Sequence, residues 1–138
     1  MSTLYNGKMI LKKRLRDENN VPYGMVVAIS KNQLGYSICN TKAGDKYDDD
    51  KALKIAIGRA NSHEDTNVDF WINRRKRTLR ENPMFYENSN DMIISESDID
   101  NIISYVYENK NYAVKNNELA ALGELKLMQD RANKYFKD

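Results

Sequence analysis

The densest group of chemically capable side chains in the sequence is a basic segment with aromatic residues on both sides. It contains Arg74, Arg75, Lys76, Arg77 and Arg80, preceded by Phe70-Trp71 and followed by Phe85-Tyr86. A guanidinium group binds a phosphate through paired N–H donors, and an aromatic ring offers a flat surface on which a base stacks. The segment is therefore typical of a site for a phosphorylated small ligand or for nucleic acid. A purely solvated charged face is the alternative interpretation.

Arg59 is the second candidate, in the run Ile57-Gly58-Arg59-Ala60. A cation near the C-terminus of a helix is stabilised by the helix dipole alone, so a structural role is sufficient to explain it. Gly58 is harder to explain, because glycine inside a helix costs about 1 kcal/mol relative to alanine. Gly58 predicts either close packing at this point or access of a ligand to Arg59.

The residues needed for the common catalytic and metal sites are nearly absent. Cys39 is the only cysteine and His63 the only histidine, which excludes disulfides within the chain, multi-cysteine metal sites and the usual catalytic triads. We expect Cys39 to be a small buried residue. The carboxylates of Asp48, Asp49, Asp50, Asp98 and Asp100 stand where helices are expected to begin, so capping explains them, and they lack calcium-loop spacing. We expect no catalytic residue, no metal and no cofactor.

The totals describe an ordinary small protein. The chain has 138 residues, a formal net charge of +2 and 41% hydrophobic residues, and its mean hydropathy is −0.77. This length predicts one domain, residues 1–138. A net charge near zero gives no global argument for nucleic acid, so only local clustering supports it. No apolar run is long enough for a membrane span and no signal-peptide pattern is present, so we expect a cytoplasmic protein without membrane contact.

The first 94 residues predict a sheet-rich part. Residues 1–6 read as a loose start, residues 8–12 as an edge strand, and residues 25–29 and 34–39 as a hairpin. Gly24 and Gly35 predict a bulge or a close backbone approach. Residues 48–61 predict a helix, with an apolar stripe at Leu53, Ala56, Ile57 and Ala60.

The sequence patterns after residue 61 include one segment that fits both a strand and a helix. Val68, Phe70 and Ile72 alternate with polar or large residues, which favours a strand followed by a basic loop or short helix, although residues 68–80 also fit a helix ending before Pro83. Short apolar patches at 84–86 and 92–94 predict a second hairpin. Residues 95–138 predict two helices; the second, about residues 114–136, is roughly 35 Å long at 1.5 Å per residue. It either lies across the sheet or pairs with another copy.

The fold class expected from these elements is α+β, with a small antiparallel N-terminal sheet, one inserted helix and two C-terminal helices. Three motifs in this order resemble small bacteriophage proteins: residues 24–28 (GMVVA), 35–40 (GYSICN) and, after Asp48, 55–60 (IAIGRA). The closing residues 130–136 (DRANKYF) are similar as well. Over residues 23–136 the chain resembles phage anti-Thoeris proteins of the first type. The resemblance implies a non-enzymatic protein that sequesters cyclic ADP-ribose-type signals in the infected host cell and so blocks host defence.

The resemblance also implies roles for particular residues. Arg59 with Arg74, Arg75 and Arg77 would pair with the pyrophosphate, Phe85 or Tyr86 would stack on the adenine, and Asn90 or Asp91 would hydrogen-bond the ribose or the base edges. The long C-terminal helix would build a homodimer or higher homo-oligomer. Two other functions stay open. One is a nucleic-acid-binding accessory or inhibitor protein that uses the cluster from Arg74 to Arg80; the other is a small enzyme acting on a nucleotide.

Overall fold

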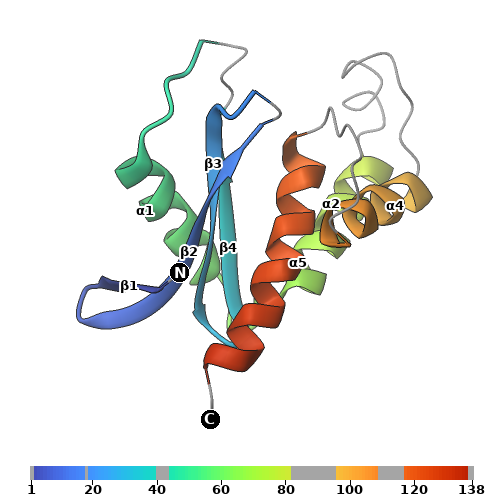
Figure 1. The fold of residues 1–138 in the computed structure, drawn as a ribbon. Helices are drawn as coiled ribbons and strands as arrows, with labels where there is room; N and C mark the ends of the chain where they lie inside the picture. The colour runs from blue at the N-terminus through green and yellow to red at the C-terminus, as the bar shows by residue number, and fades with distance from the viewer. Residues whose placement is uncertain (1, 18, 40–43, 82–95, 109–116, 137–138) are drawn as a thin grey trace.

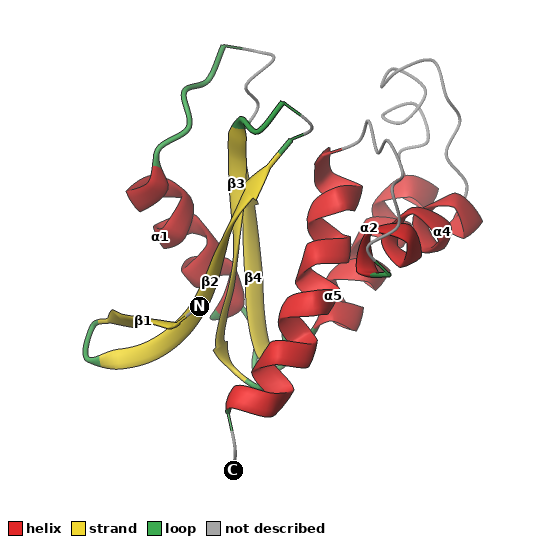
Figure 2. Cartoon of the chain, in the orientation of Figure 1, coloured by secondary structure: helices red, strands yellow, loops and turns green. Residues whose placement is uncertain are grey.

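The computed structural model describes residues 2–17, 19–39, 44–81, 96–108 and 117–136. Four antiparallel strands form one sheet in the order β1-β2-β3-β4, and helices follow (Figures 1 and 2). The strands are β1 (Ser2–Tyr5), β2 (Lys8–Arg16), β3 (Pro22–Ser30) and β4 (Gln33–Ile38). The helices are α1 (Asp49–Ala60), α2 (Val68–Glu81), α4 (Glu96–Tyr107) and α5 (Asn117–Tyr135). The expected α+β class, with an N-terminal antiparallel sheet and a long last helix, is confirmed.

The sheet carries helices on both faces. Helix α1 covers one face, where it packs on Ile10, Met25, Val27 and Ile29. Helix α5, with α2 and α4 beside it, covers the other face (Figure 1). Strand β3 lies between these two apolar layers and is buried from Tyr23 to Ile29. This double burial explains its continuous apolar sequence.

The N-terminal expectations need two corrections. Residues 2–5 form strand β1 rather than a loose start, because Asn6 and Gly7, with φ of 49° and 79°, make the two-residue turn that joins β1 to β2. Strand β2 consequently lies between β1 and β3 and is not an edge strand. The basic residues after Leu11 belong to β2 itself, an interior strand of the sheet.

Helix α1 is placed directly against strand β4. Asp48 caps it, since its carboxylate accepts from the backbone N–H groups of Asp50 (2.9 Å) and Lys51 (3.2 Å), as expected. A Cβ at Gly35 would lie 2.1 Å from the backbone oxygen of Ala56. Only glycine permits this approach, so the predicted close backbone contact is confirmed. It brings the last turn of α1, and with it Arg59, to the β4 edge.

The strand expected at residues 68–72 is wrong: residues 68–81 form helix α2. The side-chain oxygen of Asn67 accepts from the N–H of Phe70 (2.9 Å), and the amide oxygen of Gln129 on α5 accepts from the N–H of Val68 (3.1 Å). These contacts satisfy N–H groups that a helix start leaves without partners. A residue distant in sequence therefore stabilises this helix, and local alternation could not reveal it.

Helix α5 lies across the sheet. The side chains of Leu119, Leu122, Leu125, Met128 and Ala132 are fully buried in the same cluster as the strand residues. Of the two expected uses of this stripe, packing within the chain is the one observed, and these side chains are not available to a second copy. The expected start of this helix near residue 114 and the hairpin expected at 84–94 lie outside the described residues.

Candidate functional site

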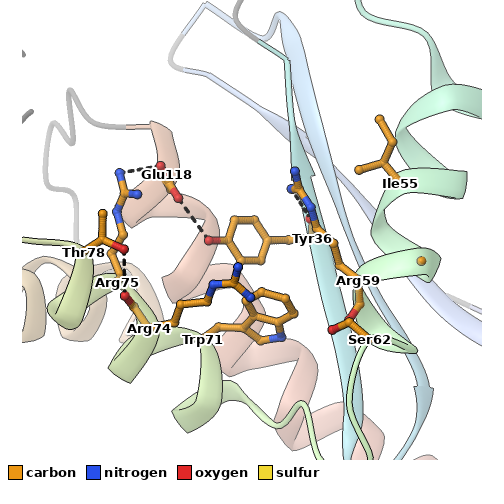
Figure 3. Close-up of a pocket in the computed structure, with 10 residues that line it drawn as sticks. Tyr36, Ile55, Arg59, Ser62, Trp71, Arg74, Arg75, Thr78 and Glu118 are labelled. Atoms are coloured by element: carbon orange, nitrogen blue, oxygen red, sulfur yellow. Dashed lines mark hydrogen bonds and ion pairs between the residues drawn. The ribbon is translucent and has the colours of Figure 1, made fainter. Parts of the chain in front are cut away.

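A pocket of about 460 Å³ lies beside strand β4, between α1 and α2 (Figure 3). Its floor is the outer edge of β4, its two walls are the helices, and α5 closes one end. The lining residues of both walls are spaced i, i+3, i+4 and i+7, and residues with this spacing share one helix face. The α1 side contributes Ile55, Gly58, Arg59 and Ser62, and α2 contributes Trp71, Arg74, Arg75 and Thr78. Tyr36 and Glu118 complete the lining.

Arg59 lies on the α1 wall at the point where the helix meets β4. Its Nη1 donates to the backbone oxygen of Tyr36 at 2.9 Å. Within the described ranges no carboxylate forms an ion pair with it. A guanidinium has five N–H donors, so one bond to β4 fixes its position and leaves donors for a ligand. Arg59 therefore has a structural role and a binding capacity together.

Arg74 faces Arg59 from the opposite wall. Its guanidinium carbon lies 5.7 Å from the centroid of the Trp71 ring, a cation–π distance. Trp71 is itself held firmly: it is only 5% exposed, and its indole N–H donates to the backbone oxygen of Leu34 at 2.8 Å. Arg74, like Arg59, pairs with no carboxylate in the part of the chain that is described. The pocket thus has two guanidinium groups whose charge is not neutralised by any carboxylate of the described residues.

Arg75 is different, because its charge is compensated. Its Nη2 lies 2.5 Å from a carboxylate oxygen of Glu118, and the other oxygen of Glu118 accepts from the hydroxyl of Tyr36 at 3.1 Å. Burial, assisted by the negative charge of Glu118, raises the pKa of the Tyr36 phenol above its usual value. The phenol therefore remains a hydrogen-bond donor at neutral pH. These three side chains link β4, α2 and α5 at the inner end of the pocket.

The rest of the basic cluster does not form one phosphate-binding face. Lys76 pairs with Asp100 at 2.7 Å, and Arg80 pairs with Glu96 at 2.7 Å, both across to α4. Arg77 is exposed on α2 and does not line the pocket. The cluster that is continuous in sequence is divided by the helix into positions that line the pocket and positions that pair with carboxylates of α4. This division weakens the case for a nucleic-acid surface.

Gly58 lines the pocket, and no other described residue packs against it there. A Cβ built on Gly58 meets no atom within 4 Å. Of the two explanations for this glycine, close packing is therefore excluded. The missing side chain widens the approach to Arg59.

The structure brings together three of the predicted arginines, Arg59, Arg74 and Arg75, and leaves Arg77 outside. Phe85, Tyr86, Asn90 and Asp91 lie outside the described residues. Sequence reasoning named Trp71 as an aromatic neighbour of the basic cluster but gave it no individual role, and it missed Tyr36, Ser62, Thr78 and Glu118. The helical spacing of Trp71, Arg74, Arg75 and Thr78 was the signal that could have found one whole wall.

A second hollow of about 270 Å³ shares Ile55 with the first and lies beside Tyr47 near the start of α1. The charged residues that line it in the described part of the chain are two acidic and two basic ones, Asp45, Asp48, Lys46 and Lys51. Burial raises the pKa of Tyr47 to about 12, so this phenol is neutral at physiological pH. Cys39, expected to be buried, is half-buried beside this hollow. The balanced charge gives this hollow less capacity for an anion than the first pocket.

Two broader surveys cover only the described residues. No group of three histidine, cysteine, aspartate or glutamate side chains forms a metal-binding cluster there. In the same ranges no helix is both long enough and apolar enough to span a membrane. In comparisons with known proteins, neither a family model, nor a curated protein, nor a solved structure matches the chain. The resemblance to phage anti-Thoeris proteins therefore stays a prediction.

Proposed function

We propose that this protein binds a small phosphorylated nucleotide in the pocket between α1 and α2 and holds it without transforming it. The observation that carries the proposal is the pair Arg59 and Arg74, two guanidinium groups on opposite walls without a carboxylate partner among the described residues. Two such groups favour an anion with more than one charged oxygen, such as a pyrophosphate. The indole of Trp71 supplies an apolar surface beside them.

The finer proposal is that the ligand is a cyclic ADP-ribose-type signal and that the protein is a phage counter-defence factor that sequesters it. Two arguments support this assignment. The motifs at residues 24–28, 35–40 and 55–60 resemble phage anti-Thoeris proteins. The pocket volume of about 460 Å³ lies within the range of roughly 300–1,000 Å³ that is common for small-molecule sites.

Binding rather than catalysis suits the lining of this pocket. Neither the histidine nor the cysteine of the chain lines it. Glu118, the one carboxylate among the described residues of the lining, accepts from Arg75 and Tyr36. A general base needs a side chain that can accept a proton from the reacting group. Both carboxylate oxygens of Glu118 are instead in contact with other side chains of the protein, Arg75 and Tyr36.

Capture and recovery of the ligand tests the proposal. The protein is incubated with cyclic ADP-ribose isomers, separated from free nucleotide by gel filtration and denatured by heat, and the released nucleotide is identified by chromatography. We expect the unchanged cyclic nucleotide in the protein fraction, and much less of it with Arg74→Ala. Recovery of a hydrolysed product would identify an enzyme, and an empty protein fraction with every isomer would exclude this ligand class.

A further inference from the structure

The two edges of the sheet differ in whether other parts of the chain hydrogen-bond to their backbone groups. At the β4 edge, the backbone N–H of Leu34 donates to the oxygen of Thr66 (3.1 Å). The backbone oxygens of Leu34 and Tyr36 accept from Trp71 and Arg59. At the outer edge of β1, no hydrogen bond is made by any residue of the described ranges. As far as the described residues show, the β1 edge is therefore the one open to another strand.

The turn between β1 and β2 determines which backbone groups point outward. In a two-residue hairpin the flanking residues, here Tyr5 and Lys8, exchange both hydrogen bonds. Because hydrogen-bonded and non-hydrogen-bonded pairs alternate, the next bonded pair is Thr3 with Ile10. The N–H and C=O groups of Ser2 and Leu4 consequently point away from the sheet.

The side chains at this edge are unusually apolar for a solvent-exposed strand. Leu4 is 65% exposed, and its cross-strand partner Met9 is 42% exposed. Both belong to the face on which Leu11 packs beneath α5, but the hairpin extends beyond this helix (Figure 1). No residue from Ser2 to Tyr5 is charged or a proline, so two common protections of a free edge are missing.

We propose that a second copy of this chain occupies the β1 edge, with its own β1 antiparallel to the first across a twofold axis at Thr3. Ser2 then lies opposite Leu4 of the partner subunit, and Leu4 opposite Ser2 of the partner subunit, so that the outward backbone groups of both strands bond to each other. The two Leu4 side chains lie diagonally on one face, about 7–8 Å apart, within reach of contact. Identical uncharged strands meet without repulsion.

This pairing joins two four-stranded sheets into one continuous sheet. It differs from the dimer expected through the C-terminal helices, because the apolar side chains of α5 are already buried within the chain. The proposal is independent of the proposed ligand. It rests on the backbone register and on the composition of residues 2–9.

Sedimentation equilibrium of the full chain at several concentrations gives the first test. We expect a dimer, and for Leu4→Lys a dimer dissociation constant raised at least about tenfold, since two lysines would meet at the interface. Val21→Lys is the matched control, because Val21 is a similarly exposed apolar residue (44%) in the turn before β3. A monomeric wild-type chain, or a dimer equally stable in Leu4→Lys, would overturn the proposal.

Cysteine crosslinking tests the register itself, in a Cys39→Ser background. Opposed Thr3 positions form a non-hydrogen-bonded pair with Cα atoms about 4.5 Å apart, within the range of about 4.4–6.8 Å that a disulfide requires. Thr3→Cys is expected to form a covalent dimer on mild oxidation, whereas Tyr5→Cys, with its two copies several residues apart, is not. Equal crosslinking of both variants, or none at Thr3→Cys, would contradict the proposed pairing.

Discussion

At the scale of single residues, the important difference between the basic residues is whether each one is paired with a carboxylate. Arg75, Lys76 and Arg80 have carboxylate partners on α4 or α5, whereas Arg59 and Arg74 have none in the described part of the chain. An ion pair with a neighbouring carboxylate reduces the attraction for an incoming phosphate. The ligand-binding capacity of the cluster is therefore concentrated in two of its members and in the indole beneath Arg74.

Tyr36 provides a prediction about pH. Burial is the main cause that raises the pKa of Tyr36 in the folded state. An exposed tyrosine, as in the unfolded state, has a pKa of about 10. Above that pH the folded state therefore keeps a proton that the unfolded state has lost. The stability contributed by the neutral phenol is complete below that value and decreases as the pH rises above it. We expect the urea unfolding free energy to fall as the pH rises above about 10, and to fall less in Tyr36→Phe. An identical decrease in both proteins would contradict this assignment.

At the scale of elements, two glycines of the α1–β4 contact predict opposite responses to the same substitution. Gly58→Ala adds a methyl group where no atom lies within 4 Å and should stabilise the helix by about 0.5–1 kcal/mol. Gly35→Ala places its Cβ 2.1 Å from the backbone of α1, so it should destabilise the fold by at least about 1–3 kcal/mol. Urea denaturation of both variants measures this difference. Equal changes of the unfolding free energy in the two variants would show that α1 does not pack against β4 at Gly35.

Much of this architecture was predictable from local patterns, and the failures have identifiable causes. The apolar run at 25–29, the close approach at Gly35 and the Asp48 cap follow from residue types alone. Strand β1 was missed because four residues form a strand only through their partner β2. At helix α2 a strand was favoured because Val68, Phe70 and Ile72 alternate as in a strand, while part of the cap of the helix comes from Gln129, far along the chain.

The same error explains what was missed at the site. With residues 68–72 treated as a strand followed by a basic loop or short helix, nothing places Trp71 and Arg74 on one face. In helix α2 they lie one turn apart on the same face. The carboxylates that divide the basic cluster lie on α4 and α5, so no local sequence window contains them. The residue types of the site were predictable. Their grouping required the helix and its tertiary partners.

At the scale of the whole molecule, the pocket and the proposed dimer interface lie at opposite edges of the sheet. The pocket is at β4 and the open edge is at β1, with two strands between them. We therefore expect Leu4→Lys to leave the ligand affinity unchanged within about twofold, a difference of well under 1 kcal/mol. Titration of wild type and Leu4→Lys with the same nucleotide measures this. A large loss of affinity would show that the two sites are coupled.

The low net charge of +2 makes a second whole-molecule prediction. A compact ligand held by two guanidinium groups depends weakly on salt, whereas binding along a nucleic-acid backbone weakens steeply because it is driven by counterion release. We expect less than about a tenfold loss of nucleotide affinity between low and physiological salt. Oligonucleotide binding that is tighter than nucleotide binding, with a steep salt dependence, would favour the nucleic-acid function instead.

The central claim is that Arg59 and Arg74 form an anion-binding pocket for a small nucleotide. Calorimetric titration with cyclic ADP-ribose isomers, using wild type, Arg74→Ala and Arg77→Ala, tests it most directly. The two variants remove the same charge from the same helix, and only Arg74 lines the pocket. We predict one ligand per chain, an affinity at least about tenfold weaker for Arg74→Ala and an unchanged affinity for Arg77→Ala. Absence of binding to wild type, or equal losses in both variants, would contradict the claim.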